Sequence, residues 1–462
     1  MPVKRLLAGG LLLAMAAAVA YGYTATRREH AYRAYLAQGD AALAQDNTFA
    51  AIEAFSGAIA VKSDSMLGYL KRGEVYRRRG EFDSALRDLT RASELDPTAP
   101  RPLELLGDTN YALRRYAKAA ERYRAYVQID DRSPRVLYKL ALAMYSVGQT
   151  APAIDAVQQA VALDDHFAEA YYVLGLCLRD VQKVDAARAA LEKAIALAPA
   201  LLHPREELAD LDRALGRTED WLQQLKALSA LDPKPARQVT LGLAYAAAGQ
   251  SDQAILTLGE AAKRYPDHTR AYVALGRVWL ERAQLRGDRV DLSKALGALE
   301  ESMGSDESSE ALTLFGRALL LTADAESAER MLQDATEKEP ADPLAFSYLA
   351  DAAERLEHYD VARRALLDYE ALKGQDADAR RRAAHATRLG DLSLQLKEPA
   401  VAVTYYRAAI DEQGPDVPIL ARLADAEWRA GDKDRARATL TKAMDKDPRN
   451  AQLLTLRRRF SR

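Results

Sequence analysis

A small residue recurs along this chain at a nearly constant step of 34 positions, and this spacing restricts the possible folds more than any other feature. Glycine inside a helix costs about 1 kcal/mol relative to alanine. A glycine that returns in register therefore indicates a close contact between helices, which offsets that cost. The recurring positions are Gly39, Gly73, Gly107, Ala141, Gly175, Ala209, Gly242, Gly276, Gly316, Ala350, Gly390 and Ala424.

Residues 66–99 show the repeating unit most clearly. Apolar side chains three and four positions apart predict two short amphipathic helices in this stretch. Gly80 separates the two helices, and Asp96-Pro97 ends the second, because proline lacks the amide hydrogen that a continuing helix needs. The unit is therefore predicted to be a helical hairpin.

Two further residue types recur in the same register. An alanine follows the first small residue after twelve positions, and a proline often closes the unit. The alanines are Ala51, Ala85, Ala119, Ala153, Ala187, Ala254, Ala328, Ala362, Ala402 and Ala436, with Ala295 displaced and Trp221 substituted. The prolines are Pro97, Pro199, Pro233, Pro266, Pro340 and Pro448.

This pattern resembles the tetratricopeptide repeat, a helix-turn-helix unit of roughly 34 residues that has small residues where its helices cross. The resemblance covers residues 32–450. It implies an all-α fold, a right-handed α-solenoid of about twelve helical hairpins in which each unit contacts mainly its neighbours. Residues 451–462 are predicted to form a C-terminal capping helix.

The repeats are predicted to be irregular near residues 283–292 and 371–382. In the first region about seven extra residues are expected in a loop between two helices, and the tripeptide Arg286-Gly287-Asp288 there is interpreted as a chance match to an adhesion motif. The second region is either a hinge or a bend between longer helices. Trp221 implies either a local separation of helices or an outward indole with a shifted register.

Residues 1–31 differ in composition from the rest of the chain. An uncharged apolar run extends from Leu6 to Tyr23 and has basic residues on both sides. It is interpreted as a single-pass N-terminal anchor with an extracytoplasmic, periplasmic solenoid, because tyrosines lie where an interfacial belt would. A cleaved signal peptide, leaving a secreted or periplasmic protein, is the alternative, since Ala18-Val19-Ala20 fits a cleavage site. A buried helix of a soluble protein is a third.

The charge pattern and the single cysteine exclude several classes of site. The chain has 65 basic and 67 acidic side chains, interspersed along its length, so no footprint for nucleic acid is present. The arginine runs at 77–79 and 380–382 are interpreted as solvated helix faces. Cys177 is the only cysteine, which excludes an intrachain disulfide and a thiolate zinc cluster, and it is expected to be packed.

The sequence contains no recognisable catalytic motif. A glycine-rich phosphate loop, a His-Glu-x-x-His pair and a serine nucleophile elbow are all absent, and the six histidines are scattered. We therefore predict that the protein is not an enzyme and has no catalytic residues, no cofactor and no metal ligands.

By analogy with the fold, function is expected to come from binding a protein or peptide on the concave face formed by the first helices. The carboxylate clamp of co-chaperone repeats is absent, because the corresponding positions include Leu70, Glu74, Arg101, Glu104 and Asp108. An asparagine ladder is absent too, because the chain has only three asparagines.

The single N-terminal membrane segment followed by tandem repeats resembles bacterial envelope assembly proteins. One of those proteins ends in a four-cysteine rubredoxin-like module, which cannot exist here. We predict a non-enzymatic protein-interaction scaffold in an envelope assembly. The alternative is a regulatory or targeting subunit of an enzyme complex, such as a polysaccharide-building machine. The oligomeric state is left open.

The binding site is predicted on the inner face of repeats three to five, where the repeat step brings aromatic and basic residues towards one groove. Tyrosine and arginine dominate interface hot spots because they combine a large buried area with a polar group. The alternative is that some of the rings pack between adjacent repeats. The predicted residues are Tyr111, Arg135, Tyr138, Tyr145, Tyr172 and Arg179.

Overall fold

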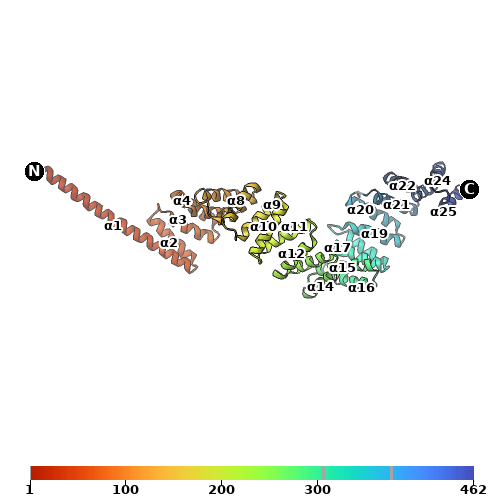
Figure 1. Ribbon diagram of the computed structural model, residues 1–462, viewed down its shortest axis with the longest axis horizontal. Coiled ribbons are helices and arrows are strands. Elements are labelled where there is room, and N and C mark those ends of the chain that lie inside the picture. Colours follow the sequence, from red (N-terminus) through yellow and green to blue (C-terminus); the bar gives the residue numbers. More distant parts are fainter. Residues whose placement is uncertain (1, 304–306, 375–377, 462) are drawn as a thin grey trace. The chain divides into compact units, whose positions relative to one another are not determined.

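The computed structural model describes residues 2–303, 307–374 and 378–461, with side chains described from residue 15 onward. In these ranges the chain forms 25 α-helices and no strand (Figure 1). Helices of 12 to 17 residues follow one another in antiparallel pairs, apart from the much longer first helix and a short last one. The predicted all-α fold class is therefore confirmed.

The chain divides into two compact units, Met1–Gln224 and Leu225–Arg462, and each is described by itself. Unit 1 contains α1 (Pro2–Ala44), α2 (Thr48–Val61), α3 (Met66–Arg78), α4 (Phe82–Leu95), α5 (Pro100–Ala112), α6 (Tyr116–Val127), α7 (Pro134–Ser146), α8 (Thr150–Leu163), α9 (Ala168–Asp180), α10 (Val184–Leu197) and α11 (Leu202–Ala214). The boundary between the units falls inside α12 (Thr218–Leu231).

Unit 2 has the same alternation of first and second helices. It contains α13 (Pro235–Ala247), α14 (Ser251–Arg264), α15 (Arg270–Arg286), α16 (Arg289–Ser302), α17 (Ser309–Leu321), α18 (Ala325–Thr336), α19 (Pro343–Arg355), α20 (Tyr359–Lys373), α21 (Ala379–Gln395), α22 (Pro399–Gln413), α23 (Val417–Arg429), α24 (Lys433–Lys446) and α25 (Ala451–Phe460).

The recurring glycines lie where the two helices of a hairpin approach most closely. A Cβ atom added to Gly107 would lie 2.3 Å from the Tyr123 ring, and one added to Gly242 would lie 2.4 Å from the Leu258 side chain. Where an alanine follows the glycine after twelve positions, it is fully buried in the same crossing, as at Ala119. Glycine is therefore needed because no side chain fits between the helices. Trp221, which replaces this alanine in repeat six, is half-buried.

The irregularity near residues 283–292 is not the predicted loop. α15 has 17 residues instead of the 13 in α3, and only Gly287 and Asp288 separate it from α16. Gly287 adopts a φ of 67°, and the Asp288 side chain accepts a hydrogen bond from the amide of Val290, so the turn is tight and capped. The prediction of a long loop is therefore wrong, because the extra residues lengthen the helices.

The irregularity near residues 371–382 also contains lengthened helices. α20 has 15 residues and α21 has 17. The predicted hinge falls partly on residues 375–377, which lie outside the described residues.

The N-terminal helix α1 is continuous over 43 residues, so the change in composition near residue 31 is not accompanied by a break in the backbone. From Arg28 onward α1 packs on α2 and the turn after it: Arg28 donates a hydrogen bond to the carbonyl oxygen of Val61, and the Tyr32 hydroxyl lies 2.6 Å from that of Ser65. Among the described residues, no helix has both the length and the apolarity that a membrane crossing requires. The predicted anchor is therefore not confirmed.

The last helix, α25, packs its apolar side against α23 and α24. Leu453 and Phe460 are buried, and the Phe460 ring stacks on Trp428 with ring centroids 4.3 Å apart.

Candidate functional site

The predicted tyrosines lie on the first helices of three consecutive repeats in unit 1. α5 carries Tyr111, α7 carries Tyr138 and Tyr145, and α9 carries Tyr172. All four rings are half-buried and pack against one hydrophobic cluster that α5–α11 share. We call these four residues, with Arg135 and Arg179, the tyrosine surface.

Each of three rings also meets another aromatic side chain. Tyr111 lies 5.0 Å from the ring of Tyr116, Tyr138 lies 5.1 Å from that of Phe167, and Tyr172 lies 6.2 Å from that of His203. His203 and Phe167 belong to the next repeat or to the turn before the next first helix. Tyr138 and Tyr172 therefore contribute to packing between repeats, as the alternative interpretation expected, whereas Tyr111 contacts a ring of its own repeat.

The hydroxyl groups of the tyrosine surface differ in their partners. Among the described residues, the hydroxyls of Tyr138 and Tyr172 have no hydrogen-bond partner, whereas that of Tyr145 lies 3.4 Å from the guanidinium of Arg179. Burial raises the pKa of Tyr138 and Tyr172, and burial together with Asp180 raises the pKa of Tyr145 to about 12. At neutral pH all three hydroxyls are therefore protonated donors.

Both arginines of the tyrosine surface are already held in ion pairs. Arg135 lies 2.8 Å from Glu104, and Arg179 pairs with Asp180 at 3.0 Å and with Glu207. Sequence reasoning placed these arginines in the groove but did not find their partners, of which Glu104 and Glu207 lie about one repeat away in the sequence.

The partner of Arg135 belongs to a buried charge network. Glu104 is 2% exposed and receives hydrogen bonds from Arg101, Arg135 and Lys139. Burial alone would raise the pKa of Glu104, but the hydrogen bonds and charges of these cations outweigh burial and lower it. Lys139 also reaches Asp108 at 2.8 Å. We infer that this network joins repeats three and four, because the ion pairs of Arg135 and Lys139 span 31 to 35 positions.

A groove in unit 2 was not predicted from the sequence. It crosses the first helices α13 and α15 and the start of α17, and encloses about 390 Å³. We call it the α13–α17 groove. It is lined by Ala236, Val239, Thr240, Leu243, His268, Arg270, Val273, Ala274, Arg277, Ser308 and Glu310.

Two polar side chains of the α13–α17 groove, His268 and Arg270, differ from the others in their partners. The Nε2 atom of His268 is buried and has no hydrogen-bond partner. Arg270 is exposed, and no carboxylate among the described residues lies within ion-pair distance of it. Arg277, in contrast, pairs with Glu310. The scattered histidines gave no reason to single out His268, and no periodic signal marks a groove built by three separate helices.

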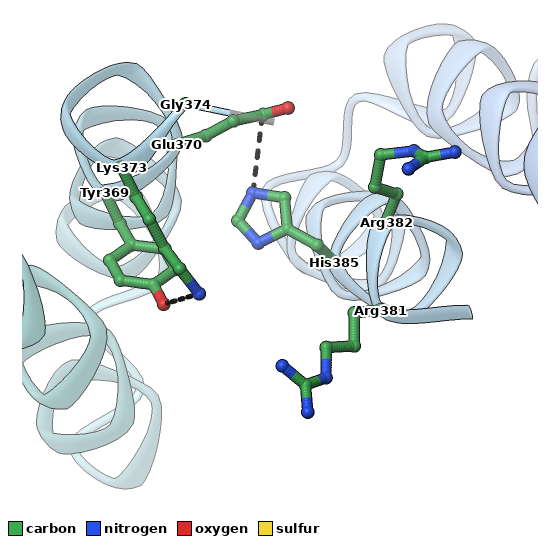
Figure 2. A pocket seen from close by; sticks show the side chains of 7 residues that line it. All are labelled: Tyr369, Glu370, Lys373, Gly374, Arg381, Arg382 and His385. Atoms are coloured by element: carbon green, nitrogen blue, oxygen red, sulfur yellow. Dashed lines mark hydrogen bonds and ion pairs between the residues drawn. The ribbon is translucent and has the colours of Figure 1, made fainter. Parts of the chain in front are cut away.

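A second cavity in unit 2 lies between α20 and α21 and has a volume of about 310 Å³ (Figure 2). Lys373 donates to the Tyr369 hydroxyl at 2.9 Å, and Arg382 donates to Glu412 at 2.8 Å. His385 faces Glu370 across the cavity at 3.4 Å, and burial lowers the pKa of the imidazole. The cationic groups Lys373 and Arg382 are therefore held by neighbours.

Other candidate chemistry is sparse in the described part of the chain. Asp164, Asp165 and His166 are close enough to share a cation, but all three are exposed in one turn, and such acidic turns are common without a metal. The thiol of Cys177 is fully buried, which raises its pKa to about 12 and keeps it protonated.

Family models support the repeat assignment in both units. Models described as tetratricopeptide repeat match residues 70–134, 239–312 and 393–460. A model described as anaphase-promoting complex, cyclosome, subunit 3 matches residues 114–194.

One curated relative is the small glutamine-rich tetratricopeptide repeat-containing protein 2 of Mycosarcoma maydis, which is 31% identical over 93 residues. The match covers 20% of this chain and 26% of the relative, so the chain spans about a quarter of that relative's length.

Similar solved structures include the MamA protein, at 27% identity over 38% of this chain and 96% of that one, with a TM-score of 0.35. PilF of Pseudomonas aeruginosa is 21% identical over 45% of this chain and 94% of its own, with a TM-score of 0.37. These low scores support no detailed comparison. With the glycine-lined helix crossings, the family matches show that the chain is a tetratricopeptide repeat protein.

Proposed function

We propose that this protein is a non-enzymatic scaffold that binds another protein through the tyrosine surface. The observation that carries the proposal is the pair of hydroxyls on Tyr138 and Tyr172, which have no partner among the described residues and sit on rings held by the core. Rings fixed in this way lose little conformational freedom on binding, and their hydroxyls can donate hydrogen bonds to a partner.

The proposal extends to a membrane tether formed by the first part of α1. Val19, Tyr21 and Tyr23 are 72%, 77% and 68% exposed, so this stretch presents apolar and aromatic side chains that the protein does not cover. A bilayer would cover them, with Arg27 and Arg28 near its surface. In this proposal the repeats face the extracytoplasmic side and serve an envelope assembly.

The tether is tested by fractionating the full-length protein and a variant that lacks residues 1–26. The full-length protein should float with membranes in a density gradient, and the truncated protein should remain in the soluble fraction with its remaining helices intact. Full-length, uncleaved protein in the soluble fraction would refute the tether while leaving protein binding untouched.

The binding surface is tested with the double variant Tyr138→Phe, Tyr172→Phe, which removes only the hydroxyls and keeps the ring packing. Capture of the partner from solubilised membranes should weaken about thirtyfold, because two hydrogen bonds of about 1 kcal/mol each are lost. Tyr123→Phe is the matched control, because its hydroxyl bonds to Asp108 inside the protein.

Unchanged capture by the double variant would rule out the tyrosine surface. If the captured partner is catalytically active, the protein is instead a regulatory or targeting subunit of an enzyme complex, and the same variants then locate the subunit contact.

A further inference from the structure

We propose that the α13–α17 groove binds an extended peptide segment that carries an acidic residue next to an aliphatic one. The proposal rests on the protein-binding function proposed above, but it concerns a different surface in a different unit. Three properties of the groove support it: its floor, an unsatisfied ring nitrogen and an unpaired cation.

The floor of the groove is made of small aliphatic side chains. Val239, Val273 and Ala274 are 8%, 5% and 5% exposed, so they belong to the core and also border the cavity. Ala236 and Thr240 are exposed at its mouth. A cavity of about 390 Å³ with such a floor takes a branched aliphatic side chain and leaves room for the backbone that carries it.

The unsatisfied nitrogen belongs to His268, which stands just before α15. A buried polar atom without a partner is rare in folded proteins, because the loss of its hydrogen bonds to water is not compensated. Either tautomer of the ring can be satisfied by an extended peptide, which offers an amide donor and a carbonyl acceptor at every residue. An aliphatic side chain in the cavity would bring that backbone alongside the ring.

The unpaired cation selects the charge of the ligand. Of the charged residues that line the groove, Arg277 and Glu310 neutralise one another, and Arg270 is left without a carboxylate among the described residues. The described residues that line the groove therefore carry an excess of one positive charge beside an apolar floor. A guanidinium forms its strongest hydrogen bonds with a carboxylate, so an acidic side chain next to the aliphatic one is favoured.

The test uses a positional-scanning library of capped hexapeptides against the full-length protein. The library should select Asp or Glu beside Val, Ile or Leu. Arg270→Glu should reverse the selection at the acidic position to Lys or Arg, and it should weaken the best wild-type peptide at least tenfold in fluorescence anisotropy. Arg289→Glu makes the same charge change at an exposed position outside the groove and should change the affinity less than twofold.

Occlusion of the groove is tested with Ala236→Trp, which adds a large side chain at an exposed position of the mouth and should abolish peptide binding without changing the melting temperature. A library without an acidic preference, an Arg270→Glu protein with unchanged selection, or full binding by Ala236→Trp would each overturn the proposal. The double variant Tyr138→Phe, Tyr172→Phe should bind the hexapeptide normally. A result that contradicts the proposal for the groove can thus be distinguished from one that contradicts the proposal for the tyrosine surface.

Discussion

Repeat three in unit 1 and repeat eleven in unit 2 lock their helix crossings with the same residues. In repeat three Gly107 precedes Asp108, whose carboxylate accepts a hydrogen bond from Tyr123 at 2.8 Å. In repeat eleven the Tyr406 hydroxyl donates to Asp391 at 2.7 Å. In each case a cation 31 positions after the aspartate, in the next repeat, completes the set: Lys139 in unit 1 and Arg422 in unit 2.

The two repeats differ at the position three residues before the glycine. Repeat three has Glu104 there, buried and bonded to three cations, whereas repeat eleven has Thr387, whose hydroxyl bonds to the carbonyl of Ala383 at 2.7 Å. The set of glycine, aspartate, tyrosine and cation therefore occurs in repeat eleven without a buried glutamate. The buried glutamate is an addition in unit 1 that ties Arg101, Arg135 and Lys139 into the contact between repeats.

The largest expected effect comes from filling the crossings, and it should be the same in both repeats. Gly107→Leu and Gly390→Leu would push a side chain into rings that already lie 2.3 and 2.6 Å from an added Cβ atom. We expect each to cost about 3 kcal/mol of local stability, seen as faster hydrogen exchange in the altered hairpin. Gly259→Ala is the control, because nothing lies within 4 Å of an added Cβ there. It should be neutral or stabilising.

A smaller loss of stability is expected from changing the residue three positions before the glycine, and it should differ between the two repeats. Glu104→Ala leaves three cations without their shared carboxylate, and we expect a loss of about 2 kcal/mol, less than for a fully buried ion pair because Arg101 and Arg135 keep contact with solvent. Thr387→Ala should cost less than about 1 kcal/mol. Hydrogen exchange in α5–α7 and α21–α23 measures both values, and equal losses would refute the distinction.

Removal of the tyrosine hydroxyls should again affect both repeats alike. Tyr123→Phe and Tyr406→Phe each delete one hydrogen bond to an aspartate that keeps its cation, so each should cost about 1 kcal/mol. Thermal unfolding combined with segment-resolved exchange checks this. A loss confined to one repeat would show that the shared residues have different roles.

The smallest expected effect is a dependence of local stability on pH. Glu104 should cause it in repeat three, and repeat eleven has no corresponding glutamate. Because the pKa of Glu104 is lowered in the folded protein from its usual 4.5, its contribution to stability is complete above about pH 4.5 and decreases as the pH falls through the lower folded value. Exchange protection in α5–α7 should therefore fall in acid, and Glu104→Gln should remove that part of the dependence.

The sequence predicted the hairpin register well because helix crossings admit only small residues. It did not reveal which side chain each glycine meets. The contact is sixteen positions later, at Tyr123 for Gly107, while the periodic alanine is at Ala119. The contacting residue varies among Phe, Leu and Tyr, so it carries no repeating signal.

The candidate sites were predictable only in part. The repeat step correctly brought Tyr138 and Tyr172 onto adjacent first helices that share a core cluster. The extension of α15 and the α13–α17 groove could not be predicted, because each depends on packing between helices that follow no residue pattern. The ion pairs of Arg135 and Arg179 could have been found by pairing opposite charges about one repeat apart.

The continuity of α1 has a mechanical consequence for repeat one. Residues 2–31 and the first helix of that repeat belong to one rod, in which about 30 residues extend roughly 45 Å at 1.5 Å per residue. Because the helix has no break, a rotation of its first turns is passed on to its end. A partner that binds these first turns would therefore also fix the orientation of the α1–α2 hairpin. Attachment of the N-terminal end of α1 would therefore determine the direction of the first repeat.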